Sequence, residues 1–419
     1  MDLSAQLDSL DPGSEAGASR AVRLAALERF MALGLPDRRV ETWRYTDLTS
    51  LRKKGFSFSA PPPDAAALET AGVVLREHDL AIEGARLVFV DGHLAESLST
   101  PPQPEQVGFE SAASTLTQDS DGTALAALNT AFASGEHCLR FRGTDSGPVE
   151  LVFIGSGRQL APQLRLRIEL EAGARAEVIQ RFIDIPDAGE AWLNLVTDIT
   201  LGSESNLSLH RLQLHQPEQV QTTLHRARLA AGAKLTAGNV ELGGALVRNE
   251  FEIALDGEDA EADVFSLTLT RDSQHSDTRI AVDHRAPRTM SLQNQRAILD
   301  DSSRAVFNGK VTVQPDAQHI EARQRSDSLL LSPRAEVDAK PELEIYADQV
   351  VCSHGATVGE LSDDHLFYLR ARGIDAPTAR GILTAAFADT ILQRIGLESL
   401  REAARLAVRE RLPRAIETT

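Results

Sequence analysis

The sequence has very little cysteine and no long hydrophobic run. Cys138 and Cys352 are its only cysteines in 419 residues. Two thiols are too few for a disulfide framework, a four-cysteine zinc site or a four-thiolate iron–sulfur site held by this chain alone. No stretch approaches the roughly 18 consecutive apolar residues of a transmembrane helix, and the acidic N-terminal sequence shows no signal-peptide core. Because scarce cysteine favours a reducing compartment, we expect a cytoplasmic protein that does not bind membranes.

The sequence also has fewer basic than acidic residues. The chain has 43 Lys and Arg residues against 61 Asp and Glu residues, which gives a net charge of −18. Such a charge repels phosphate groups, so we expect no nucleic-acid partner and no polybasic attachment to a membrane surface. The hydrophobic content of 42% is nevertheless sufficient for a folded core and argues against wholesale disorder.

Recognisable catalytic and nucleotide-binding motifs are absent as well. The sequence contains no Walker phosphate loop, no G-x-G-x-x-G after a strand, no G-x-S-x-G nucleophile elbow and no H-E-x-x-H zinc motif. His210 and His215 flank one alternating segment, and their odd separation predicts opposite faces and no shared metal ion. We therefore expect that the chain is not an enzyme.

Between about residues 137 and 359 the sequence alternates between apolar and polar residues. In LRLRIELE the residues Leu164, Leu166, Ile168 and Leu170 share one face, and LEIYADQVV (Leu343–Val351) is expected to be a similar strand. Small turns rich in Gly, Ser and Asp recur at spacings of 25 to 45 residues, which is typical of a solenoid. We expect a mainly β protein with a parallel β-helix core. A β-sandwich is the alternative, although more than 200 residues of short strands exceed one sandwich.

Helical patterns flank this core, and we expect three regions at 1–135, 136–360 and 361–419. The first region is mostly helical, with one helix over Gly17–Leu35 and a hairpin turn at Asp91–Gly92.

The C-terminal region returns to helical periodicity. Ser362 or Asp363 is expected to cap its first helix, and Asp375 its second. The region carries a charge of +1, whereas residues 1–360 carry −19, so it forms an electrically distinct appendage.

Cys352 and His354 form one constellation with possible metal chemistry. They lie two residues apart on an expected strand, so their side chains should project from the same face with about 7 Å between their Cα atoms. A thiolate beside an imidazole can bind iron or zinc. The alternative is that Cys352 is a small buried hydrophobe and His354 a turn residue before Gly355. Cys138 is expected to be a core thiol.

Two segments resemble a known family. KPELEIYADQVVCSHGATVGELSDDHLFYLRARGI (Lys340–Ile374) closely resembles the C-terminal signature of the SufB/SufD family of iron–sulfur cluster assembly proteins. ETWRYTDL (Glu41–Leu48) resembles the N-terminal motif of the SufD branch. The resemblance implies a right-handed parallel β-helix between N-terminal and C-terminal helical regions. In DSLLLSPRAEVD (Asp327–Asp338), Ala335 stands where the SufB paralogue has its cysteine, which implies a SufD-like partner subunit.

The resemblance also implies partners and site residues. Cys352 and His354 would lie at an interface with a SufB-like scaffold subunit and would offer ligands to transient iron or to an iron–sulfur cluster shared with that subunit. The helices from Ser362 onward would dock a SufC-like ABC ATPase. The implied docking residues are Leu366, Phe367, Tyr368, Arg370, Arg372, Gly373 and Phe387. A reduced flavin is implied for the complex, with no residues assigned to it.

Three alternatives stay open at this point. The apolar stripe Leu383, Phe387, Ile391 and Ile395 is explained equally by packing between the chain's own helices. A solenoid could also belong to a polysaccharide lyase or hydrolase, although such enzymes need an aromatic- and carboxylate-lined groove that this sequence does not show. The chain could finally act alone as a homodimer with paired Cys352 and His354 sites.

Overall fold

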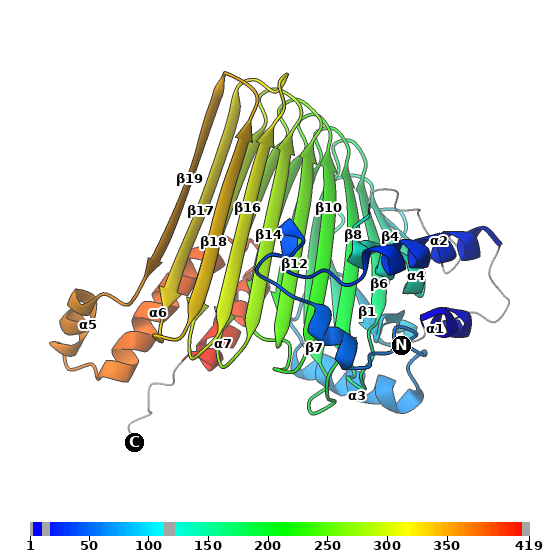
Figure 1. Cartoon of the computed structure of the whole chain (residues 1–419), viewed down its shortest axis with the longest axis horizontal. Helices are drawn as coiled ribbons and strands as arrows, with labels where there is room; N and C mark the ends of the chain where they lie inside the picture. The colour runs from blue at the N-terminus through cyan, green and yellow to red at the C-terminus, as the bar shows by residue number, and fades with distance from the viewer. Residues whose placement is uncertain (1–2, 11–16, 113–121, 413–419) are drawn as a thin grey trace.

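The computed structural model describes residues 3–10, 17–112 and 122–412, which form a β-solenoid flanked by helices (Figure 1). Its strands build two facing sheets of ten and nine strands, and from β4 onward successive strands alternate between the two sheets. The first sheet runs in the order β19-β17-β15-β13-β11-β9-β7-β5-β1-β2, and the second in the order β18-β16-β14-β12-β10-β8-β6-β4-β3. The expected mainly β solenoid between two helical regions is confirmed. The sandwich alternative is excluded, since apart from two antiparallel pairs, β1–β2 and β3–β4, the strand pairs are parallel.

The ten-stranded sheet consists of β1 (Ala85–Val90), β2 (His93–Leu94), β5 (Pro148–Gly155), β7 (Arg175–Asp184), β9 (Asn206–Gln213), β11 (Lys234–Glu241), β13 (Glu261–Thr270), β15 (Met290–Leu299), β17 (Ile320–Leu330) and β19 (Val350–Gly359). The nine-stranded sheet consists of β3 (Val107–Ala112), β4 (Glu136–Phe141), β6 (Gln163–Leu170), β8 (Trp192–Leu201), β10 (Val220–Leu229), β12 (Leu246–Leu255), β14 (His275–His284), β16 (Arg304–Val313) and β18 (Glu336–Ile345).

Aliphatic side chains stack along the inside of the solenoid. The four alternating residues Leu164, Leu166, Ile168 and Leu170 of β6 are all buried, as the sequence pattern predicts. Ile168 lies opposite Ile199 of β8, so successive turns repeat the same kind of contact. Full burial of such a side chain contributes about 1.5–3 kcal/mol. One strand prediction is wrong: LEIYADQVV is divided between the end of β18 and the start of β19, because the chain turns at residues 346–349.

The N-terminal helices cover both outer faces of the solenoid, mostly at the end that carries β1 and β3, whereas η1 (Glu41–Trp43) reaches β12 in the middle of the nine-stranded sheet. They are α1 (Leu3–Leu10), α2 (Gly17–Leu33), η1, η2 (Thr49–Lys53), α3 (Ala65–Glu77), η3 (Glu96–Leu98) and α4 (Ala124–Phe132). The α2 and α4 helices pack together on the outer face of the nine-stranded sheet, whereas α3 packs against β1, β5 and β7 of the other sheet. The predicted helix from Gly17 and the hairpin turn at Asp91–Gly92 are confirmed.

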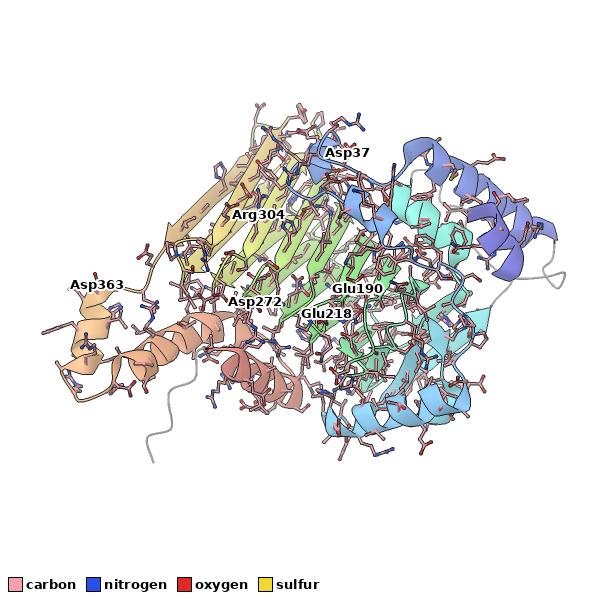
Figure 2. The ribbon with its side chains drawn as sticks, turned by 60° about the horizontal axis from the view of Figure 1, so that its bottom comes forward. Asp37, Glu190, Glu218, Asp272, Arg304 and Asp363 are labelled. Atoms are coloured by element: carbon pink, nitrogen blue, oxygen red, sulfur yellow. The ribbon has the colours of Figure 1, made fainter. Side chains whose placement is uncertain are left out.

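The C-terminal region of the described chain holds three helices, and the last two lie on the outer face of the ten-stranded sheet. The three helices are α5 (Asp363–Arg370), α6 (Ala376–Leu392) and α7 (Glu398–Arg411). The predicted caps are confirmed, since the side chains of Ser362 and Asp375 accept hydrogen bonds from the backbone N–H groups of His365 and Thr378. The α6 and α7 helices share an apolar cluster with β13, whereas α5 extends away from the solenoid, as Figure 2 shows at Asp363. No helix among the described residues is both long and apolar enough to cross a membrane.

Candidate functional site

The last rung of the solenoid is open. β18 pairs only with β16 and β19 only with β17, so within the described chain each strand leaves one edge without a partner strand (Figure 1). Every residue of these two strands is at least partly exposed. An edge of free N–H and C=O groups can accept a strand from another molecule.

Cys352 and His354 lie on β19 and face the interior side of this open rung. Cys352 is opposite Ala322 of β17, and His354 is opposite Gln324. Ala322 and Gln324 are buried inside the solenoid. The pairing therefore places the thiol and the imidazole on one face of the edge strand, where another molecule that covers the rung would meet both.

The two side chains have different surroundings. Cys352 is half-buried against an apolar cluster that includes Ile320 and Ala322, whereas His354 is exposed. Burial raises the pKa of the Cys352 thiol above its ordinary value. The thiol is therefore protonated at neutral pH and becomes a metal ligand only when a cation promotes loss of its proton.

Two donors do not make a complete metal site. Among the described residues, no three His, Cys, Asp or Glu side chains come together in a way that could hold a metal ion. Metal sites of this class generally use four protein ligands. Any metal held by Cys352 and His354 would therefore need ligands from outside the described residues.

The other candidate ligands have separate, local partners. The Nε2 atom of His210 lies 3.9 Å from Glu177, whereas Nδ1 of His215 lies 2.9 Å from Asp184. Cys138 is buried, and its sulfur accepts a hydrogen bond from Nε of Arg167 at 3.5 Å, which agrees with a structural thiol.

The predicted docking residues fall into two groups. On and after α5, Phe367 and Tyr368 are 75% and 56% exposed, and Arg372 stacks on Tyr368 with its guanidinium carbon 3.5 Å from the ring centre. Leu366 is half-buried, Arg370 is exposed, and Gly373 ends the helical segment at a φ of +84°. These residues form an exposed aromatic and basic surface beyond the solenoid.

Phe387 belongs to the other group, because it contacts the chain's own solenoid. The guanidinium carbon of Arg296 on β15 lies 4.5 Å from its ring centre, and Nη1 of Arg296 donates a hydrogen bond to its carbonyl oxygen at 2.8 Å. Ile391 and Ile395 of the same stripe are buried in the cluster beneath α6 and α7. Internal packing therefore accounts for these three residues of the stripe.

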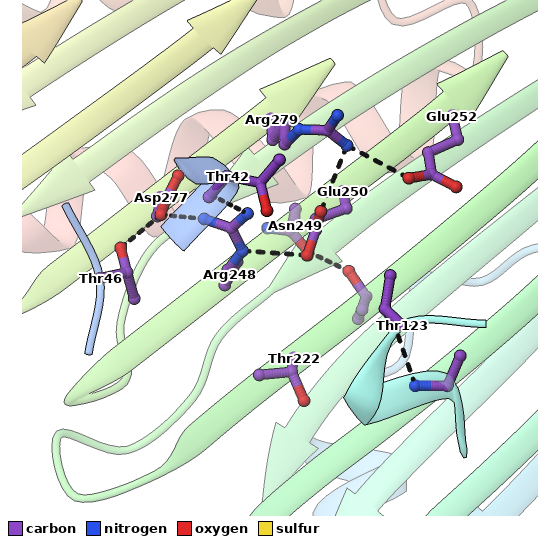
Figure 3. A network of polar contacts seen from close by, with 12 residues as sticks. Thr42, Thr46, Thr123, Thr222, Arg248, Asn249, Glu250, Glu252, Asp277 and Arg279 are labelled. Atoms are coloured by element: carbon purple, nitrogen blue, oxygen red, sulfur yellow. Dashed lines mark hydrogen bonds and ion pairs between the residues drawn. The ribbon is translucent and has the colours of Figure 1, made fainter. Parts of the chain in front are cut away.

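The N-terminal motif Glu41–Leu48 is held against the outer face of the nine-stranded sheet by Arg248 and Asp277, which are called the clamp below (Figure 3). Arg248 of β12 donates a hydrogen bond from Nη2 to the Thr42 carbonyl oxygen at 2.7 Å and forms a buried ion pair with Asp277 of β14. The Thr46 hydroxyl also bonds to Asp277. Trp43 is buried beneath the Arg248 guanidinium.

Sequence reasoning missed Arg248 and Asp277. Both occupy outward positions on their strands, where a charged residue normally indicates contact with solvent. The only sequence feature related to this contact was the ETWRYTDL motif, and the motif indicated a family resemblance without indicating which residues it contacts.

Comparison with known proteins identifies the family of the chain. The family model described as "SUF system FeS cluster assembly, SufBD core domain" matches residues 153–387. The chain is 31% identical to the iron–sulfur cluster assembly protein SufD of Escherichia coli, over 92% of both chains. It is 29% identical to a SufBD family protein of Synechocystis, over 90% of this chain and 88% of that protein. The chain therefore belongs to the SufBD family of the SUF iron–sulfur cluster assembly system.

Proposed function

We propose that the chain is a SufD-like, non-enzymatic subunit of a cytoplasmic SUF complex. It pairs with a SufB-like scaffold subunit, docks a SufC-like ATPase and supports iron acquisition and cluster formation. The observation that carries this proposal is the open last rung, which presents Cys352 and His354 on one face of an unpaired edge strand.

The composition of β19 supports pairing with another chain. Solenoids usually end in a polar cap, and exposed edge strands are usually protected by lysine, proline or a bulge. The sequence of β19, VVCSHGATVG, contains no lysine, arginine, carboxylate or proline. A second solenoid placed end to end would bury this edge and the half-exposed apolar residues beneath it.

Iron, or a nascent cluster, is the cargo of this interface. Cys352 and His354 supply a soft and a borderline donor, and the SufB-like subunit supplies the remaining ligands. Burial raises the pKa of the Cys352 thiol, so this donor stays protonated until a metal displaces its proton. A half-site of this kind favours transient binding over storage.

The exposed α5 surface supports docking of the ATPase. The sequence has no phosphate-binding loop of its own, so nucleotide hydrolysis belongs to another subunit. Phe367 and Tyr368 are large apolar side chains left in solvent, which is typical of a contact surface. Substitution Phe367→Ala should weaken binding of the ATPase by about tenfold or more, whereas Ile382→Ala, which removes an exposed side chain of α6, should leave it unchanged.

Anaerobic reconstitution of the co-expressed complex tests the site. The wild type is compared with His354→Ala and Cys352→Ser, and His78→Asn serves as the control because His78 is exposed at the end of α3, which packs against β1, β5 and β7 far from β19 in the strand order. We expect His354→Ala to lower the yield of cluster while the subunits still co-purify. Unchanged yield in both site variants would refute the metal role.

Size-exclusion chromatography distinguishes this complex from a scaffold acting alone. We expect the isolated chain to shift to the heteromeric complex when the SufB-like and SufC-like subunits are added. A homodimer that persists in their presence and assembles a cluster would support the homodimeric alternative instead.

A further inference from the structure

A cavity of about 350 Å³ lies between the N-terminal helices and the outer face of the nine-stranded sheet. It is remote in sequence from the open rung and plays no part in the function proposed above. Aromatic and aliphatic side chains dominate its lining, and one charged side chain joins them. The lining includes Phe30, Leu51, Arg52, Phe56, Phe58 and Trp192.

The floor of the cavity is a rigid aromatic cluster. Trp192 of β8 is 1% exposed, and its Nε1–H donates a hydrogen bond to the Thr222 hydroxyl at 2.9 Å. The rings of Phe56 and Phe58 meet it edge to face, with centroids 6.1 and 5.7 Å away. Because the indole N–H of Trp192 already donates to Thr222, the aromatic cluster offers only apolar contacts to a ligand.

The size of the cavity favours an occupant. Protein interiors are close-packed, and an empty space lined by apolar side chains costs stability because its walls lose dispersion contacts. A volume of about 350 Å³ falls within the range of small-molecule sites, which are mostly apolar with a few polar groups that orient the ligand.

The charge at the cavity favours an anion. Residues 37–54 contain six basic and three acidic side chains, a net charge of +3 in a chain whose total is −18. Arg39 pairs with Asp37, and Lys54 pairs with Glu190. Arg52 lines the cavity and forms no ion pair or hydrogen bond among the described residues; the Asp37 carboxylate lies within electrostatic range of Arg52 but is bonded to Arg39. Arg52 is therefore available to a negatively charged group.

We propose that this cavity binds a small amphipathic anion. Its aromatic or aliphatic body lies against Trp192, Phe56 and Phe58, and its carboxylate, sulfonate or phosphate group pairs with Arg52. The guanidinium fixes the orientation of the ligand, and the aromatic floor supplies most of the buried apolar area.

Two fluorescent probes with the same aromatic skeleton test the proposal. 8-Anilino-1-naphthalenesulfonate carries the anionic group, whereas N-phenyl-1-naphthylamine lacks it. Each is titrated into the full-length wild type and the Arg52→Gln variant. Lys53→Gln is the matched control, because Lys53 is the adjacent basic residue and does not line the cavity. We expect Arg52→Gln to weaken the sulfonate by about fivefold, the scale of one partly exposed ion pair. The neutral probe should bind both variants as it binds the wild type.

A second variant locates the bound probe. Met31 stands at the edge of the cavity and is 64% exposed, so Met31→Trp should reduce the binding of both probes without disturbing the core. The proposal is overturned if neither probe binds the wild type, if Arg52→Gln and Lys53→Gln affect the sulfonate equally, or if Met31→Trp leaves the binding of both probes unchanged.

Discussion

His354 lies opposite Gln324 in the parallel pairing of β19 with β17, and the side-chain carbonyl oxygen of Gln324 is buried with no hydrogen-bond partner among the described residues. A metal-binding histidine usually donates its second ring N–H to such an acceptor, which fixes the orientation of the ring. If His354 binds metal as proposed, Gln324 is the neighbouring acceptor that we expect to orient its imidazole.

The first prediction concerns this acceptor. Replacement Gln324→Met keeps the length of the side chain but removes the oxygen, so we expect iron binding by the reconstituted complex to weaken by about tenfold. The measurement is anaerobic iron titration of the complex. Ser326→Ala is the control, because Ser326 is the next inward residue of β17 and lies opposite Ala356. Equal losses in the two variants would indicate damage to β17 and would argue against a role for the glutamine.

The second prediction concerns the clamp on the N-terminal motif. The Arg248 guanidinium carbon lies 3.8 Å from the centre of the Trp43 ring, and the ion pair of Arg248 with Asp277 is buried. Replacement Arg248→Met leaves the Asp277 charge buried without its partner, which should lower the free energy of unfolding by about 3–5 kcal/mol. Urea denaturation measures the change.

Arg228 provides the control for the clamp. It also lies on the nine-stranded sheet, on β10, and pairs with Asp256, but its side chain is 68% exposed. Arg228→Met should therefore change the free energy of unfolding by less than about 1 kcal/mol. Similar losses from the two substitutions would contradict a special role for the clamp.

These two sites show what the sequence could and could not predict. Alternation alone identified the inward faces of strands such as β6, and spacing alone placed Cys352 and His354 on one face, because both properties are local. The clamp joins Arg248 to Thr42 across 206 positions of the chain. No local pattern distinguishes this buried outward arginine from Arg228, which remains in solvent.

Long-range pairing limited the prediction elsewhere too. The helical pattern of the first 135 residues does not reveal that β1 pairs in parallel with β5, with Ala85 opposite Val149. The sequence likewise could not predict that β18 and β19 each have an unpaired edge, because that property depends on which strands lie side by side and not on the composition of each strand.

The third prediction concerns the response to acid. Burial lowers the pKa of His137, His210 and His284 from 6.5 to about 4. These rings stay neutral in the folded chain, whereas the unfolded chain protonates them below about pH 6.5. The unfolded state therefore binds more protons, and stability should fall as pH decreases from about 6.5 to 4, by on the order of 3 kcal/mol for each histidine.

Substitution His284→Gln tests this linkage. Both ring nitrogens of His284 bond to hydroxyls, those of Thr289 and Ser291 at 2.8 Å, so the variant will lose stability at neutral pH. Its unfolding free energy should nevertheless depend less steeply on pH, by about one proton, in urea titrations between pH 4 and 7. A wild-type slope in His284→Gln would refute the buried, neutral state of this ring.

The last prediction concerns the unprotected edge of β19. Ala356 is exposed, and its side chain faces the open interior opposite Ser326. Replacement Ala356→Lys places a charge where a second solenoid would have to desolvate it, and lysine is the residue that commonly protects edge strands. We expect loss of pairing with the SufB-like subunit in pull-down experiments, with the thermal unfolding of the isolated chain unchanged because the position is already in solvent. Leu406→Lys on α7, where Leu406 is 59% exposed, introduces the same charge away from the edge and should pair normally. Normal pairing by Ala356→Lys would mean that the partner binds another surface, and it would also remove the argument that Cys352 and His354 meet their remaining ligands across this edge.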